Sequence, residues 1–253
     1  MQAYPLLAQS ALWGGFASAA LVGGALIGYY VKLNQRIVAG VMAFGSGALL
    51  SALSFELMGE AYRIGGVRST AIGFIAGAVI FSALNLLLSR CGAKHRKRSN
   101  LNNRLGAEAT NYTALAIAIG ALIDGIPESL VIGIGMMNNG TVSMVTVAAV
   151  FISNLPEGLS SSVGMKNNDK KLGYVLGIWG SIALICPIFS VAGYFFSQNI
   201  TAGGVAMIMA VGAGAILAML ADTMIPEAFE ETHNFAGLIT VAGFLSAFVL
   251  DKI

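Results

Sequence analysis

Eight long apolar stretches alternate with short polar connections along the chain. Within each stretch the apolar residues would cover all sides of a helix, whereas a surface helix of a water-soluble protein keeps one polar face. A helix needs roughly 20 residues to cross the hydrocarbon core of a bilayer. The pattern therefore predicts an all-α membrane protein, a bundle of eight transmembrane helices forming a single domain over residues 1–253. The expected spans are 8–31, 37–58, 69–89, 113–136, 142–163, 173–196, 204–227 and 235–250.

The composition agrees with this class. Hydrophobic residues make up 57% of the 253 residues, charged residues make up 10%, and the mean hydropathy is +0.79. A water-soluble domain carries about 25% charged residues, so this chain lacks the polar surface to cover itself in water. The first apolar run has no Lys or Arg before it and exceeds the hydrophobic region of a secretory signal peptide, so we interpret it as the first span.

The basic residues predict the orientation. Of the 14 Lys and Arg, three lie in the second connection or at the C-terminus, namely Arg63, Arg68 and Lys252. The other eleven lie in the first, third and fifth connections: Lys32, Arg36, Arg90, Lys94, Arg96, Lys97, Arg98, Arg104, Lys166, Lys170 and Lys171. Because basic loops remain in the cytoplasm, both termini are expected on the outer side of an inner or plasma membrane.

The longest connection, CGAKHRKRSNLNNRLGAEAT at 91–110, is polar and shows no apolar periodicity, so it is expected to be a cytoplasmic loop. Its KHRKR cluster could bind anionic lipid head groups or could simply fix the topology. The 32 glycines include GFIAG at 73–77, a spacing that lets helices approach closely in lipid. These glycines favour a compact bundle and are compatible with a homodimer.

A short repeat carries the candidate chemistry. DGIPESL (124–130) and SNLPEGL (153–159) lie 29 residues apart, and TMIPEAF (223–229) is a third version. Asp124 and Glu128 are four residues apart, so they share one helical face. Ser153 and Asn154 precede Glu157 by four and three residues and share a face with it. We therefore expect the polar faces of the fourth and fifth spans to meet at similar depth.

These polar faces suggest a cation site. An ionised carboxylate at mid-bilayer is costly unless it meets a cavity, a partner or a cation. Pro127 and Pro156 each deprive a backbone carbonyl of its usual amide donor, and no Lys or Arg lies within a span to neutralise the acids. The positive charge could come from a proton, with protonated acids hydrogen-bonding between helices, or from a metal ion. We favour a metal site whose ligands are all oxygens: Asp124, Glu128, Ser153, Asn154 and Glu157.

The fourth and fifth spans resemble those of the Zrt/Irt-like (ZIP) family of divalent-metal transporters. That family carries a His-Asn-x-Pro-Glu-Gly type motif in the fourth span and a related Pro-Glu motif in the fifth, where this chain has IDGIPES and SNLPEG. TMIPEAFEE is similar to the family's seventh-span segment. The resemblance implies eight spans, outward-facing termini and a midplane metal site, often binuclear. The chain departs from the motif at Asp124, Gly125, Ser129 and Ser153.

The candidate metals and pathway follow from these residues. An all-oxygen site suits manganese, magnesium or iron(II), while the resemblance points to zinc; cadmium is a further candidate. Glu56 at the outer end of the second span could attract cations, or could form a water-exposed pair with Glu60. Asp222 and Glu227 in the seventh span could relay the ion towards the cytoplasm.

These features predict a permease that moves divalent transition metals into the cytoplasm. The alternative is a membrane sensor or assembly component that binds metal without moving it. An enzyme is not expected, because no His or Lys lies in a span to activate Ser160, Ser161 or Ser162. The expected partners are metal ions as substrate and the lipid bilayer, with no cofactor and no nucleic acid.

Overall fold

The computed structural model describes residues 6–88, 107–139, 143–167 and 169–252. All regular structure in these ranges is helical. The α-helices are α1 (Leu6–Tyr30), α2 (Gln35–Ala52), α3 (Met58–Leu88), α4 (Ala107–Asn139), α5 (Met144–Asn167), α6 (Leu172–Gln198), α7 (Ala202–Met219), α8 (Ile225–Thr232) and α9 (Ala236–Lys252). Two π-helical turns, η1 (Leu53–Leu57) and η3 (Leu220–Met224), and a short 3₁₀ turn, η4 (His233–Phe235), join some of them.

Five helical stretches among the described residues are long and apolar enough to cross a bilayer. They are Leu6–Tyr30, Gln35–Leu88, Ile119–Met136, Leu172–Gln198 and Ala202–Lys252. These stretches fit a multi-pass, all-α membrane protein, as the hydrophobic pattern predicts. Helix α5 is not among them, since it carries Asn154, Glu157, three consecutive serines and Lys166.

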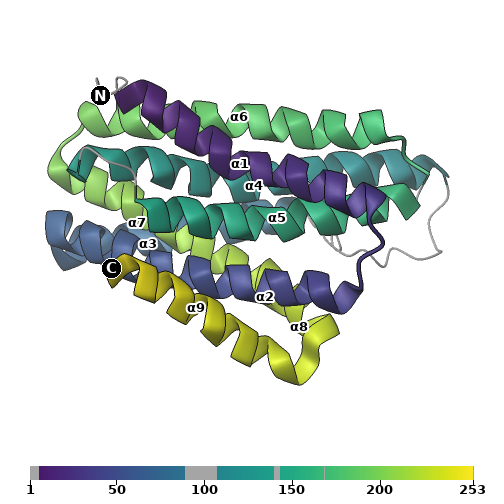
Figure 1. Cartoon of the computed structure of the whole chain (residues 1–253). Coiled ribbons are helices and arrows are strands. Elements are labelled where there is room, and N and C mark those ends of the chain that lie inside the picture. Colours follow the sequence, from purple (N-terminus) through teal and green to yellow (C-terminus); the bar gives the residue numbers. More distant parts are fainter. Residues whose placement is uncertain (1–5, 89–106, 140–142, 168, 253) are drawn as a thin grey trace, which may run out of the picture.

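Two of the five stretches are 54 and 51 residues long, about twice what one crossing needs. Each contains a backbone break. In α3 the break lies at Gly66, whose φ of 68° and ψ of −179° glycine adopts without a side-chain clash. Between α8 and α9 it lies at His233, with φ 45°, where the chain turns back along the bundle (Figure 1).

The predicted loop over 91–110 differs from the structure at its C-terminal end. Residues 91–106 lie outside the described part of the chain, but α4 already begins at Ala107. Residues 107–110, predicted as loop, therefore belong to the helix. Hydropathy alone could not reveal this, because a helix can project beyond a membrane.

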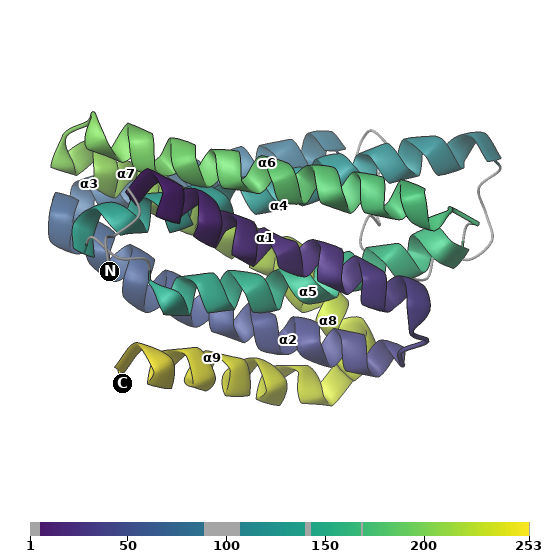
Figure 2. The ribbon, with the colours of Figure 1, turned by 45° about the horizontal axis from the view of Figure 1, so that its top comes forward.

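The helices fall into two packing groups. The most extensive contacts are those of α3 with α7, α1 with α5, α4 with α6, α2 with α9, and α1 with α6. We call α1, α4, α5 and α6 the first helix group, and α2, α3, α7, α8 and α9 the second helix group. Helix α5 lies between α1 and α2, so it belongs to the first group and faces the second (Figure 1, Figure 2).

Glycines bring the backbones together inside each group. A Cβ atom placed on Gly133, Gly158, Gly77 or Gly243 would fall 1.8, 2.1, 1.9 or 2.0 Å from a carbonyl oxygen of the neighbouring helix. No side chain fits at such distances, so these four helix pairs pack backbone to backbone, as small residues allow in lipid. Between the groups, the glycine nearest the candidate residues is Gly45 of α2, whose Cβ would lie 3.1 Å from the Cα of Ser153.

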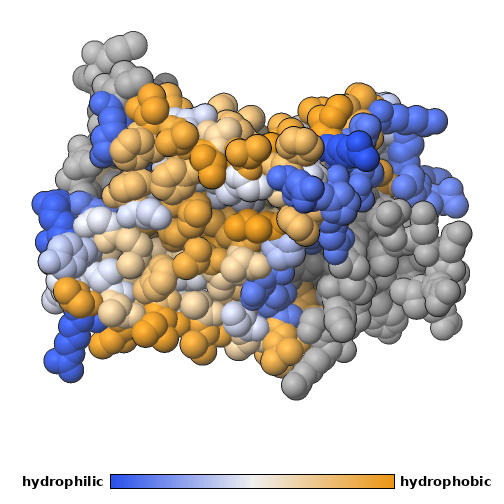
Figure 3. All heavy atoms as spheres, turned by 90° about the horizontal axis from the view of Figure 1, so that it is seen from below, coloured by the Kyte–Doolittle hydropathy of each residue, from blue (hydrophilic) through white to orange (hydrophobic). Residues whose placement is uncertain are grey.

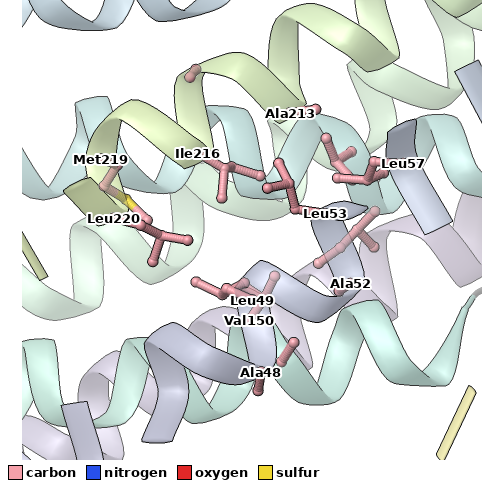
Figure 4. Packing of buried hydrophobic residues seen from close by; sticks show 14 of the residues in the cluster. Ala48, Leu49, Ala52, Leu53, Leu57, Val150, Ala213, Ile216, Met219 and Leu220 are labelled. Atoms are coloured by element: carbon pink, nitrogen blue, oxygen red, sulfur yellow. The ribbon is translucent and has the colours of Figure 1, made fainter. Parts of the chain in front are cut away.

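Apolar side chains fill the interior of the second helix group and its boundary with α5. Leu49 and Leu53 from α2 and η1 meet Ile216 and Leu220 from α7 and η3, together with Val150 of α5 (Figure 4). These side chains are nearly fully buried. On the face seen in Figure 3, hydrophobic surface forms a broad band between hydrophilic patches at the two ends, the distribution expected for a bundle that spans a bilayer.

Candidate functional site

The five residues predicted as ligands all lie inside the bundle. Asp124 and Glu128 of α4 are 1% and 2% exposed, and Ser153, Asn154 and Glu157 of α5 are 1%, 4% and 7% exposed. Carboxylates are rarely buried to this degree, because removing the charge from water costs several kcal/mol unless it is compensated. Their burial on two neighbouring helices is the central feature of the site.

One contact joins the two helices directly. The Ser153 hydroxyl lies 2.9 Å from the carbonyl oxygen of Val150 and 3.4 Å from Glu128 Oε1, and its single proton can be donated to either acceptor. The structure therefore brings Glu128 and Ser153 together across the α4–α5 pair. Asn154 lies nearby but is turned towards α1, since its amide nitrogen donates to the Ala17 carbonyl at 3.2 Å. Only the amide oxygen of Asn154 could then serve as a ligand.

The prolines lie inside α4 and α5 as expected. Pro156 cannot donate to the carbonyl of Ile152, which leaves this oxygen able to accept from elsewhere. A Cβ on Gly45 would come within 3.3 Å of that same oxygen. The carbonyl released by Pro156 thus faces α2, at the boundary between the two helix groups.

Sequence reasoning missed the contribution of α6. Cys186 is 2% exposed, its thiol lies beside Ser129, and it is within electrostatic reach of both Glu128 and Glu157. Its sulfur would also lie only 3.2 Å from a Cβ on Gly125. The one available signal was that this cysteine directly precedes Pro187 in the middle of a span, but a buried cysteine ordinarily acts as a small apolar residue.

The residues do not form a closed cage in this conformation. Within the described ranges, no three His, Cys, Asp or Glu side chains lie close enough together to hold a metal ion. The site therefore consists of the Glu128–Ser153 contact, with Asp124 one turn earlier on α4 and Glu157 one turn later on α5. Binding one ion through all three carboxylates would require α4 and α5 to adjust.

The three residues predicted along the pathway lie on the second helix group. Glu56 is half-buried in η1, Asp222 is exposed in η3, and Glu227 is half-buried in α8. Both π-helical turns thus carry an acid that was singled out from the sequence. Such turns are rare and occur frequently at functional sites.

A cavity of about 470 Å³ opens at the end of the bundle that contains η1 and the C-terminal end of α9. Charged residues line it, namely Glu56, Glu60, Arg63, Asp251 and Lys252, so acids outnumber bases by three to two. Val131 and Ile132 of α4 also line it, and Val131 lies three residues beyond Glu128. The cavity therefore reaches to within about one helical turn of the buried site.

Comparison with known proteins does not extend this description. No protein-family model matches the chain, and no curated protein matches it significantly. What the fold and site define is an all-α, multi-pass membrane protein with buried carboxylates on two adjacent helices.

Proposed function

We propose that the protein is a permease that carries divalent transition-metal ions across the membrane towards the cytoplasm, as its resemblance to the Zrt/Irt-like family implies. The observation that carries the proposal is the burial of Asp124, Glu128 and Glu157 on α4 and α5, with Glu128 in contact with Ser153. Buried intramembrane acids most often mark an ion or substrate pathway.

The proposed topology has eight crossings. The two long stretches, divided at Gly66 and near His233, supply two crossings each, and α1, α4, α5 and α6 supply one each. The Leu6 end of α1 and the Lys252 end of α9 lie at the same end of the bundle, which an even number of crossings requires (Figure 1). Basic loops then place both termini outside.

The packing groups suggest how the ion would move. All five main residues lie on the first helix group, whereas Glu56, Asp222 and Glu227 lie on the second. Rocking one group against the other around a midplane site is a common solution among transporters. Metal would enter through the cavity near Glu56, bind between α4 and α5, and leave past Asp222 and Glu227.

The direct test is metal flux. Purified protein in sealed proteoliposomes should take up manganese at a saturable rate well above that of empty liposomes, with zinc, iron(II), cadmium and magnesium added as competitors. An oxygen-dominated site should favour manganese or iron over zinc. Binding of metal without uptake would contradict the permease and support the sensor or assembly component.

The topology has its own test. Lys32→Cys, in the exposed segment before α2, should react with an impermeant maleimide only after the membrane is permeabilised. Asn199→Cys, in the exposed turn between α6 and α7, should react in intact cells. The two positions lie at opposite ends of the bundle, and peptide mass spectrometry separates them from the native cysteines. The reverse labelling pattern would invert the proposed direction of transport.

A further inference from the structure

Glu56 is bound to the beginning of a helix in the other group. Its carboxylate oxygen Oε2 accepts hydrogen bonds from the hydroxyl groups of Ser143 and Thr146. Ser143 immediately precedes α5, and its hydroxyl in turn accepts from the Thr146 amide at 3.1 Å. The Ser143 carbonyl accepts from the Val147 amide, also at 3.1 Å. Ser143 therefore caps α5, and Glu56 is attached to this cap.

This position suits an anionic side chain. The N-terminus of a helix carries partial positive charge and favours a carboxylate. Hydrogen bonds to an ionised acceptor are roughly twice as strong as those between neutral groups. Glu56 is half-buried and Thr146 is 6% exposed, so water competes weakly for these bonds. The carboxylate thus fits α5 in charge and in hydrogen-bonding geometry.

The other charged groups at this cavity are engaged with one another. Arg63 and Glu60 form an ion pair at 2.5 Å within α3, and Lys252 and Asp251 form one at 2.7 Å at the end of α9. Both pairs join residues of the second helix group to each other. Among the charged residues that line the cavity, Glu56 therefore differs in being bonded to the first helix group.

We propose that Glu56, Ser143 and Thr146 form a latch that holds the two helix groups together at the end of the bundle containing the cavity. With the latch closed, Ile132 at the inner wall of the cavity is 2% exposed. Separation of η1 from the start of α5 would widen the passage between the cavity and Glu128. The role of the latch in transport rests on the proposed function. In a permease, the latch would keep the entrance closed until the two helix groups move apart.

The latch can be tested without any transport measurement. The reporter is Ile132→Cys, a smaller side chain buried at the cavity wall, and the measurement is the rate of maleimide labelling at position 132 in metal-free membranes. Glu56→Gln removes the charge with little change of shape, and Thr146→Val removes one hydroxyl donor. Each substitution should raise the labelling rate about threefold or more. In the double variant, the fold increase should be smaller than the product of the two separate fold increases, because both substitutions break the same contact.

Two controls accompany the reporter. Glu60→Gln removes a carboxylate that lines the same cavity but pairs with Arg63, so labelling at position 132 should stay at the parental rate. Gly135→Cys lines the cavity where a Cβ meets no atom within 4 Å, so its labelling should be rapid in every variant and should verify that the reagent reaches the cavity. An unchanged elution profile in detergent should verify that each variant is folded. Parental rates in both Glu56→Gln and Thr146→Val, or an equal increase with Glu60→Gln, would overturn the latch.

The outcome separates the latch from the proposed function. If labelling responds as expected but proteoliposomes show no metal uptake, the latch stands and the permease is wrong. If uptake is observed and labelling does not respond, the permease stands and the latch is wrong.

Discussion

Replacing Glu128 or Glu157 with alanine is expected to reduce metal uptake by at least about tenfold, while the protein still folds and reaches the membrane. Each carboxylate would contribute a charged ligand, and losing roughly 1.4 kcal/mol of binding already gives a tenfold change. Folding should survive because a buried ionised group costs free energy, so its removal takes away a penalty as well as its contacts.

The matched control is Glu230→Ala, which removes a carboxylate from an exposed position on α8. Its uptake should remain close to that of the parent. Expression and the elution profile in detergent should be similar for all three variants, so that any loss of flux reports on the site. Normal uptake by both Glu128→Ala and Glu157→Ala would mean that these carboxylates are structural, joining helices without contacting the ion.

Much of this arrangement could be predicted from the pattern along the chain. The periodicity of a helix is local in sequence, so the apolar runs predicted an all-α fold, although helix also covers residues 59–68 and 107–112, outside the predicted spans. The spacing of Asp124 and Glu128 placed them on one face for the same reason. The polar faces of the fourth and fifth spans were predicted to meet at similar depth, and Ser153 does lie beside Glu128.

Other features depend on helices that are distant in sequence. The Asn154 amide turns towards Ala17 on α1, and Cys186 of α6 comes within electrostatic reach of Glu128 and Glu157. Both features are set by how α1, α4, α5 and α6 pack together. Local periodicity contains no information about such packing. The π-helical turns at η1 and η3 are similar: one extra residue per turn changes the direction in which Glu56 and Asp222 point, and no residue in LSFEL or LADTM signals it.

The binding of Glu56 to Ser143 also lay beyond the sequence. Glu56 was expected either to attract cations or to form a water-exposed pair with Glu60. In the structure Glu60 pairs with Arg63, and Glu56 reaches α5, 87 residues away along the chain. The contact between the Glu56 carboxylate and the start of α5 can be inferred only when η1 and α5 are known to lie side by side.

The metal preference is expected to depend most on Asp124. This residue is 1% exposed and stands one turn before Glu128. The proposed resemblance to the Zrt/Irt-like motif would align it with that motif's histidine. An imidazole there would replace a hard anionic oxygen with a neutral nitrogen of intermediate softness and would lower the negative charge of the site by one. Nitrogen ligands suit zinc better than manganese or magnesium.

Asp124→His should therefore raise zinc uptake relative to manganese by about tenfold, since roughly 1.4 kcal/mol of differential binding is sufficient. Asp124→Asn is the matched control, because it removes the same charge and keeps an oxygen. Its uptake should fall for every ion without a change in their order. The measurement is competition between zinc and manganese in the proteoliposome assay. If Asp124→His ranks the metals as the parent does and Asp124→Asn keeps the parental rate of uptake, Asp124 does not contact the ion, and the ligands reduce to Glu128, Ser153, Asn154 and Glu157.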